Sequence, residues 1–389
     1  MRGVPYTTPE KMASSSRAIV GVMIALLGLG TVMVYSATFV EQLRNSGSSA
    51  VLGPLSGHVL KVGLALLVFL LALRVKPGAL FAWARMLWTV AVMLLIAVLV
   101  VGTELNGSRR WFDVAGMSFQ PSELARVATI IMIGAWTASA RDRVSELRQG
   151  VLIPFAFAAI PAVLVFVEPD LGSSVFLLFM GVLVMWVGGA RSRHLLAVFL
   201  PAVAAASLYG WANFGHVPGR LASFTNPTVN SQVGQGLTAI GNGGVTGQGL
   251  GSGIGQWGLV PEAESDWVLS VVGEELGLLG TGLVVVLYAL ILWHGVRILL
   301  GLRSRFSLVV GAGLLMQVLV QAVLNIAVVT ALAPPKGLPL PFVSAGGTSL
   351  LVLCASVGLL LGLARRPEDD PVIEARLATS LTYRGEPGA

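Results

Sequence analysis

The sequence contains very little charge. Of its 389 residues only 11% are Asp, Glu, Lys or Arg, whereas 55% are hydrophobic and the mean hydropathy is +0.83. Soluble domains carry roughly 25% charged residues, because water requires a charged outer layer that lipid does not. The composition therefore excludes a soluble globular protein and predicts an all-α polytopic membrane protein.

Cysteine is almost absent as well. Cys354 is the only one and lies in an apolar run, so an intramolecular disulfide and a cysteine-based metal cluster are both excluded. The net charge of +6 would suggest nucleic-acid binding in a soluble protein. Its placement along this chain indicates membrane topology instead, and no nucleic-acid partner is expected.

Long uncharged stretches predict about ten transmembrane helices, because about 20 apolar residues cross the hydrocarbon layer with their backbone groups paired inside each helix. They are expected at residues 18–40, 56–73, 86–103, 121–139, 150–167, 171–189, 194–212, 267–294, 306–331 and 342–364. The first is too long for a signal-peptide core and is expected to be retained. The predicted organisation is an N-terminal segment (1–17), a single ten-helix domain (18–364) and a C-terminal tail (365–389).

The longest connection is predicted at residues 213–266, between the seventh and eighth helices. Its central part, 234–258, holds 11 glycines in 25 residues, which disfavours a lipid-exposed helix and predicts a loop. Long connections are usually functional or disordered. Glycine richness is compatible with both.

The distribution of Lys and Arg predicts the orientation. With the N-terminus inside, the cytoplasmic segments hold 18 of the 25 basic residues but only 8 of the 19 acidic residues. Both termini are then cytoplasmic, and the 213–266 loop is extracytoplasmic. The seven outer basic residues cluster in short polar segments.

The first outer segment contains Arg109 and Arg110 beside aromatic residues, followed by Glu123 at the start of the fourth helix. Paired arginines can hold a phosphate or a sugar. The alternative is an aromatic-anchored interfacial loop in which Glu123 pairs with Arg126, three residues later on the same helix.

The second segment joins the fifth and sixth helices and contains Glu168 and Asp170. Two acids at the membrane edge can bind a cation. A helix-capping role is favoured for Asp170.

The third segment is the long loop, with Arg220 and Gln235 among glycines that permit close approach to a large polar ligand. It ends in three carboxylates, Glu262, Glu264 and Asp266, at the mouth of the eighth helix. A carboxylate at a helix N-terminus is ordinarily a cap, worth about 1 kcal/mol. Composition alone therefore assigns Asp266 to capping.

The fourth segment combines an amide pair, Gln321 and Asn325, with Lys336 and Ser344. Intramembrane amides commonly join helices. Lys336, between prolines and near a Gly-Gly pair that opens a helix, is suited to an anionic head group.

Glu274 and Glu275 lie one after the other in the eighth predicted helix. Carboxylates inside a membrane must be hydrated or paired. A water-filled cavity reaching them from the outer face is the preferred interpretation, and pairing with Arg or Lys is the alternative.

These segments, taken in order with Leu29–Ser36 and Ser344–Ser349, resemble the SEDS family (shape, elongation, division and sporulation), which includes FtsW and RodA. The similarity extends over nearly the whole chain. It implies a ten-helix peptidoglycan glycosyltransferase that polymerises lipid II at the outer side of the bacterial cytoplasmic membrane. Asp266 falls where the family has an aspartate needed for polymerisation, in the motif Pro-Glu-x-x-(Thr/Ser)-Asp.

The resemblance also implies roles. Asp266 would act as general base, or with a metal, as the acceptor hydroxyl attacks the donor sugar; such a base contributes about 10²- to 10⁴-fold in rate. Arg109, Arg110, Arg220 and Lys336, with Mg²⁺ or Mn²⁺, would neutralise the departing pyrophosphate. Gln235 and Ser344 would contact substrate. The supporting polar and acidic residues would be Glu123, Glu168, Asp170, Glu262, Glu274, Glu275, Gln321 and Asn325.

Within the family, Pro261–Ala263 and Gly273–Gly277 are more similar to the division member FtsW than to the elongation member RodA. The expected partners are lipid II, the growing glycan strand, a class B penicillin-binding transpeptidase and divisome membrane proteins. Gln248 and Gln256 replace a frequent lysine, and Ala345 replaces a usual tyrosine. A RodA-like polymerase, a lipid-linked precursor flippase and a non-catalytic division scaffold are the alternatives.

Overall fold

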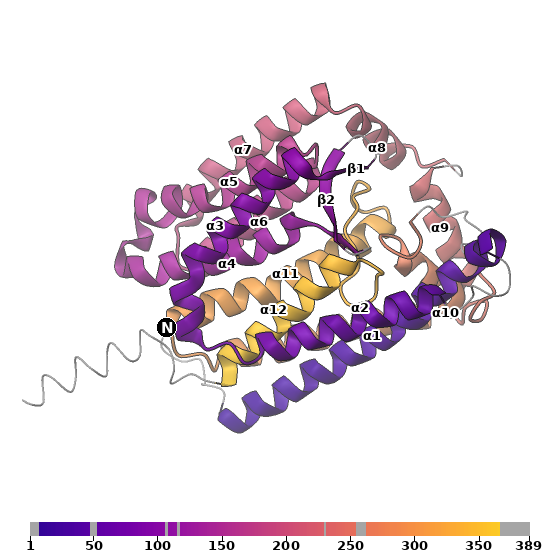
Figure 1. The fold of residues 1–389 in the computed structure, drawn as a ribbon, viewed down its shortest axis with the longest axis horizontal. Helices are drawn as coiled ribbons and strands as arrows, with labels where there is room; N and C mark the ends of the chain where they lie inside the picture. The colour runs from indigo at the N-terminus through magenta and orange to yellow at the C-terminus, as the bar shows by residue number, and fades with distance from the viewer. Residues whose placement is uncertain are drawn as a thin grey trace, which may run out of the picture.

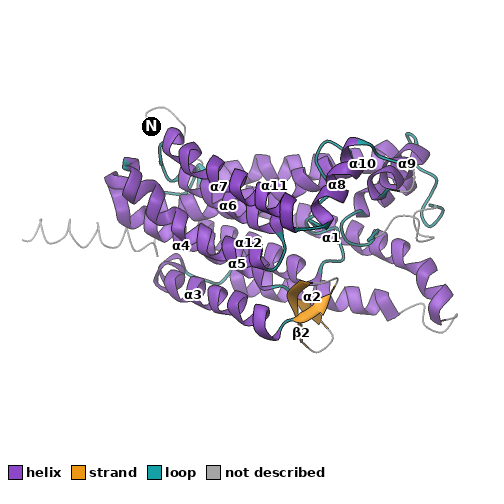
Figure 2. Cartoon of the chain, turned by 90° about the horizontal axis from the view of Figure 1, so that it is seen from above, coloured by secondary structure: helices purple, strands orange, loops and turns teal. Residues whose placement is uncertain are grey.

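The computed structural model describes residues 8–46, 53–105, 108–114, 117–228, 231–253 and 262–365. Helices dominate it (Figures 1 and 2). They are α1 (Pro9–Ser46), α2 (Gly53–Ala72), α3 (Pro77–Val101), α4 (Pro121–Ala140), α5 (Ile153–Val167), α6 (Leu171–Val187), α7 (Ser192–Asn213), α8 (His216–Thr225), α9 (Gln232–Gly243), α10 (Val268–Leu299), α11 (Arg305–Val329) and α12 (Gly347–Arg365).

Every predicted span coincides with one of these helices. Eight of the described helices are long and apolar enough to cross a membrane. The exceptions among the predicted ten are α6, which is apolar but has 17 residues, and α4, whose first turns carry Glu123 and Arg126. The prediction of a polytopic all-α membrane protein is confirmed.

The helices differ in how much of their surface is buried. Central α4 and α11 pack against α6 and α12, and most of their side chains are buried. In α7 only Leu195 and Gly210 are buried, while Leu200, Leu208 and Trp211 are exposed. Large apolar side chains on an outward face need an apolar surrounding, so the outer helices present a surface suited to lipid.

A small sheet between α3 and α4 was not predicted. It consists of β1 (Thr103–Leu105), β2 (Ser108–Val114) and β3 (Met117–Phe119), joined as antiparallel neighbours in that order. The polar segment that contains Arg109 and Arg110 is therefore a short antiparallel sheet. Successive residues of a strand point to opposite faces, which separates Arg109 from Arg110.

The connection from α7 to α10 is partly helical, although glycine content predicted an irregular loop. It contains α8 and α9, and the Ser231 hydroxyl caps α9 by accepting from the Gly234 amide. Two of its glycines permit close packing: Gly236 lies against the Trp267 ring and Gly243 against the Gly273 carbonyl. A side chain at either position would collide, so these glycines serve contact with α10.

Helix α10 is broken at Gly277, which has φ 66° and ψ −160°. The amides of Gln248 and Gly249 donate to the carbonyls of Glu274 and Glu275, 3.0 Å away in each case. The loop after α9 thus pairs carbonyl groups that the break leaves without helical partners.

Three helix starts differ from prediction by five residues or more. Helix α1 begins at Pro9, nine residues before the predicted residue 18 and inside the segment 1–17 that was predicted to precede the membrane domain. Helix α3 begins nine residues earlier than expected, at Pro77, because proline is well tolerated in the first helical turn. Helix α12 begins at Gly347, later than the predicted residue 342, because residues 341–344 form a turn closed by the Ser344 hydroxyl and the Leu340 amide.

The connections rich in basic residues lie together at one end of the molecule. Arg305 donates to the carbonyls of Arg141 and Gly188, which joins the α10–α11, α4–α5 and α6–α7 connections. Near the described ends of the chain, Met12 contacts Gly301 and Gly362 lies against the α2–α3 connection. The two described ends of the chain therefore share one end of the bundle.

Candidate active site

At the other end of the bundle the helices surround a cavity of about 800 Å³. All four outer segments recognised in the sequence contribute to its wall. The charged side chains that line it are Lys61, Arg110, Glu123, Arg126, Asp170, Arg220, Glu262, Glu264, Asp266 and Lys336. This cavity, called here the central cavity, is the candidate active site.

Asp266 lines the central cavity instead of capping α10. The residue that precedes α10 is Trp267, and its side chain makes no capping hydrogen bond. The Asp266 carboxylate lies against Gly337, while its own amide donates to the Glu262 carbonyl at 3.1 Å. The assignment of Asp266 to capping, made from composition, was wrong; the carboxylate is available to a ligand.

Burial controls the proton affinity of Asp266. Removal from water raises its pKa to about 7, assisted by Glu262 and Glu264 and opposed by Arg220 and Lys336. A group with a pKa near neutrality can both accept and release a proton, which suits a general base.

Lys336 is shifted in the opposite direction to Asp266, because burial lowers the pKa of a lysine and raises that of an aspartate. Burial lowers its pKa to about 7, although Asp170, Glu123 and Asp266 favour the charged form. Its ammonium lies 5.1 Å from the centre of the Phe176 ring, and its stem passes over Gly172, where a side chain would collide. A partly buried lysine held in this way offers a positive charge to an anion in the cavity.

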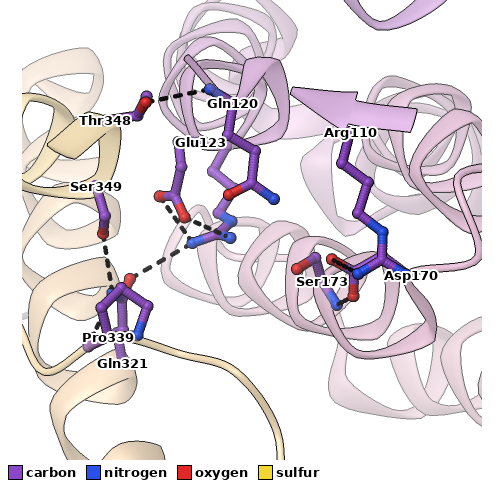
Figure 3. Close-up of polar contacts among 10 residues, drawn as sticks. Arg110, Gln120, Glu123, Asp170, Ser173, Gln321, Pro339, Thr348 and Ser349 are labelled. Atoms are coloured by element: carbon purple, nitrogen blue, oxygen red, sulfur yellow. Dashed lines mark hydrogen bonds and ion pairs between the residues drawn. The ribbon is translucent and has the colours of Figure 1, made fainter. Parts of the chain in front are cut away.

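Hydrogen bonds fix the Arg110 side chain beside the N-terminus of α6. It donates to the carbonyls of Glu168 at 2.9 Å and Pro169 at 2.6 Å, and lies 3.8 Å from the Asp170 carboxylate. Figure 3 shows this pair beside Ser173. The position of Arg110 follows from the strand alternation of β2, which sends Arg109 outward to an exposed ion pair with Glu104 at 3.4 Å.

Asp170 caps α6, as expected, by accepting from the Ser173 amide at 2.9 Å. Burial alone would raise its pKa, but Lys336, Arg110 and Ser173 together hold the pKa below its usual value. Glu168 is also buried, outside the central cavity. Its burial and the nearby Asp170 raise its pKa to about 8 in spite of Arg110.

Glu123 and Arg126 form a buried ion pair at 2.9 Å, and each carries almost no exposed surface. The predicted pairing three residues apart on one helix is therefore correct. Arg126 also reaches Gln321 at 3.4 Å and stacks on Phe176, 4.9 Å from the ring centre. Both ions line the central cavity, so this pair is part of the site as well as of the core.

Gln321 and Asn325 attach α11 to the segment that precedes α12. Gln321 donates to the Pro339 carbonyl at 2.9 Å and to the Ser349 hydroxyl at 3.3 Å (Figure 3). Asn325 donates to the carbonyls of Asp266 and Leu338 at 2.8 and 2.7 Å. The amide pair thus positions the backbone on both sides of the catalytic candidate.

Four other predicted site residues lie away from the cavity wall. Ser344 closes the turn before α12, and Gln235 belongs to α9. Glu274 and Glu275 are fully buried in α10 and line none of the described cavities, so the expectation of a water-filled cavity around them was wrong. Instead, Ser36 of α1 donates to Glu275 at 2.6 Å.

Sequence reasoning missed His58 and Lys61, which line the central cavity from α2. They are three residues apart and so share a helix face. The signal was available: two polar side chains interrupt an otherwise apolar span. Thr348 was also missed. Its hydroxyl accepts from the Gln120 amide (Figure 3). The same hydroxyl donates to the Ser118 carbonyl, which ties α12 to β3.

A preformed metal centre does not fit the described residues. Among them no group of three or more His, Cys, Asp or Glu side chains is placed to share an ion. Asp266 has acidic neighbours in Glu262 and Glu264, but they supply too few grouped ligands to hold a divalent cation by themselves.

The chain belongs to the FtsW/RodA/SpoVE family of membrane proteins, described as cell cycle proteins, whose sequence model matches residues 17–368. It is 30% identical to stage V sporulation protein E of Bacillus subtilis, over 91% of this chain and 98% of that one. It is 34% identical to the probable peptidoglycan glycosyltransferase FtsW of Mycobacterium tuberculosis, over 90% and 68%. A chain from a solved peptidoglycan synthase complex that coordinates polymerization and crosslinking matches with a TM-score of 0.72 at 27% identity, over 90% of this chain and 97% of that one.

Proposed function

We propose that the protein is a peptidoglycan glycosyltransferase that polymerises lipid II into β-1,4-linked glycan strands and releases undecaprenyl pyrophosphate. The observation that carries the proposal is one cavity that holds a carboxylate with a pKa near 7, Asp266, together with the cations Arg110, Arg220 and Lys336. Its relatives carry the matching activity in their names.

The chemistry assigns distinct roles to these groups. Asp266 accepts the proton of the acceptor hydroxyl as that oxygen forms a bond to C1 of the donor sugar. The bond from C1 to the pyrophosphate oxygen breaks, and the leaving group takes the electron pair. Arg110, Arg220 and Lys336 stabilise the charge that develops there.

A lateral groove of about 610 Å³ supports a lipid-linked donor. It runs between α6, α7, α8 and α11 and is lined mainly by apolar side chains such as Val175, Phe179 and Leu324. Arg110, Arg220 and Lys336 line both this groove and the central cavity. A prenyl chain in the groove would place its pyrophosphate beside the three cations.

In this proposal a divalent cation binds together with the substrate and not to the protein alone. Mg²⁺ commonly binds through one or two carboxylates plus substrate phosphates. Asp266 is the residue that would hold it, and the pyrophosphate would supply the remaining charge.

We further propose that the protein works in septal wall synthesis, with a class B penicillin-binding transpeptidase and other division proteins. The resemblance of Gly273–Gly277 to the FtsW pattern supports the division role. In this proposal the central cavity faces outward and both termini are cytoplasmic, because the basic connections gather at the opposite end of the bundle.

Purified protein, incubated with labelled lipid II and its transpeptidase, tests the activity. Glycan ladders are expected from the wild type and not from Asp266→Ala. Ladders that survive this substitution would exclude Asp266 as the base. Lipid scrambling without polymer would favour a flippase, and neither activity would favour a scaffold. Depletion in cells separates the roles, since filaments indicate division and rounded cells indicate elongation.

A further inference from the structure

Residues 336–345, called here the strap, connect the Asp266 region with the core of the bundle. Lys336 and Gly337 at its start line the central cavity, and the Asp266 carboxylate lies against Gly337. The rest of the strap has neither helix nor strand and is nevertheless buried at Leu338, Leu340, Phe342 and Val343. Whatever holds this buried part therefore also sets the position of Lys336 and Gly337.

Prolines make the strap stiff. Pro339 and Pro341 have a fixed φ, and the residue before each of them is restricted as well. Few free rotations therefore remain along the strap. A displacement at Pro341 is transmitted towards Lys336 instead of being absorbed on the way.

A strained residue lies next to Pro341. Phe342 has φ 65°, in the left-handed region that is unfavourable for a bulky side chain. A residue in such a conformation persists only where its surroundings hold it in place. The strap therefore needs restraints on both sides of Phe342.

Helix α1 supplies the first restraint. A Cβ atom on Gly30 would stand 2.5 Å from the Val343 carbonyl oxygen and 2.9 Å from that of Phe342. The backbone of α1 thus lies directly against the strap. This contact prevents the strap from moving towards α1.

Helix α10 supplies the second restraint. The Tyr288 hydroxyl donates to the Pro341 carbonyl at 2.5 Å, and the Tyr288 side chain is only 6% exposed. The described residues offer that carbonyl no other donor. An aromatic ring alone would fill the same space in the core, so the specific effect of the hydroxyl is to hold the strap.

Helix α11 holds the strap closer to the cavity. Gln321 donates to the Pro339 carbonyl (Figure 3), and Asn325 donates to the Leu338 carbonyl. Neither amide reaches the part of the strap beyond Pro339. That part depends on Tyr288.

We propose that Tyr288 is a positioning residue: its hydroxyl holds the strap against α1 and thereby keeps Lys336 and Gly337 beside Asp266. The inference rests on the proposed function, because it assigns the arrangement of the base and its neighbouring cation to a residue that touches neither. Tyr288 lines none of the described cavities and is given no contact with substrate.

Tyr288→Phe removes the hydroxyl and keeps the ring. With lipid II as substrate, kcat is expected to fall roughly tenfold, less than for a full displacement of about 1 Å, because the α11 amides remain. KM should stay close to that of the wild type, because Arg110 and Arg220 are untouched. Ser356→Ala is the matched control and should keep the wild-type kcat, since it removes a buried hydroxyl that donates to the Val352 carbonyl within α12.

The pH profile distinguishes positioning from a general loss of structure. Lys336 lowers the pKa of Asp266, so a strap that carries Lys336 away should raise that pKa. The rise of activity with pH is then expected at higher pH in Tyr288→Phe than in the wild type. A kcat that is unchanged, or that falls equally at every pH, would overturn the positioning role.

Hydrogen exchange tests the restraint without turnover. In lipid nanodiscs, the amides of Leu340, Val343 and Ala345 should exchange roughly tenfold faster in Tyr288→Phe, as for loss of one buried hydrogen bond, and at the wild-type rate in Ser356→Ala. Faster exchange supports the restraint even if the wild type forms no glycan and the proposed function fails. Unchanged exchange overturns it even if glycan is formed.

Discussion

The Asp266 carboxylate lies so close to Gly337 that a Cβ at this glycine would stand 2.7 Å from Oδ2. Gly337 follows Lys336 directly, so one short segment sets the positions of both the base and its neighbouring cation. The atom that would have to move is the end of a flexible side chain. A methyl group at position 337 should therefore displace the carboxylate while the fold is kept.

Gly337→Ala is accordingly expected to lower the rate of glycan formation up to about 100-fold, since a displacement of about 1 Å can have that effect. The thermal unfolding temperature should stay close to that of the wild type. Gly241→Ala is the control, because nothing lies within 4 Å of a Cβ there. Wild-type activity in Gly337→Ala would show that the position of this carboxylate is not critical.

The pH dependence of polymerisation should be bell-shaped, with its maximum near pH 7. Asp266 must lose its proton to act as base, so activity rises as pH increases through its pKa of about 7. Lys336 must keep its proton to neutralise pyrophosphate, so activity falls above its pKa of about 7. Initial rates across the pH range, measured with lipid II, give both limbs.

Two substitutions test which residue is responsible for each limb of the pH profile. Glu262→Gln removes a negative charge that raises the pKa of Asp266, so the acidic limb should move to lower pH. Lys336→Arg keeps its charge at high pH, so the alkaline limb should move upward. An acidic limb that stays in place in Glu262→Gln would argue that another group titrates.

The Glu123–Arg126 pair should be important for stability. Arg126→Met leaves the Glu123 charge buried without its partner, which typically destabilises by about 3–5 kcal/mol. The double variant Glu123→Gln with Arg126→Met removes both charges and should unfold at a higher temperature than Arg126→Met alone.

The exposed pair on the adjacent sheet provides the comparison. Arg109→Met breaks the ion pair with Glu104 at the surface, where such pairs contribute about 0–1 kcal/mol. Thermal unfolding in detergent, followed by intrinsic fluorescence, measures all these variants. Equal effects of Arg126→Met and Arg109→Met would contradict a structural role for the buried pair.

Chelation tests the proposed divalent cation. EDTA is expected to abolish glycan formation, and Mg²⁺ or Mn²⁺ added separately should restore it. Binding of the apoprotein to the cation alone should be weak, because the described residues form no group of three ligands. Full activity in EDTA would exclude the cation from the reaction.

The positions of the helices could be predicted because each depends only on the length and polarity of its own stretch of sequence. Each uncharged stretch has the length needed to cross the hydrocarbon layer, and each produced a helix in the structure. The β1–β3 sheet and helices α8 and α9 could not be predicted in this way. Glycine content carries no information about whether a residue such as Gly236 is flexible or pressed against Trp267.

The sequence by itself determined that the protein spans a membrane, which segments are polar, and which family pattern includes Asp266. Tertiary structure decided which of those polar residues meet. Arg110 enters the cavity and Arg109 does not, because strand residues alternate. Glu274 and Glu275 lie in the core, because α9 and the loop after it pack against the start of α10. His58 and Lys61 join the site only because α2 packs against α12, a contact between segments almost 300 residues apart that no local pattern specifies.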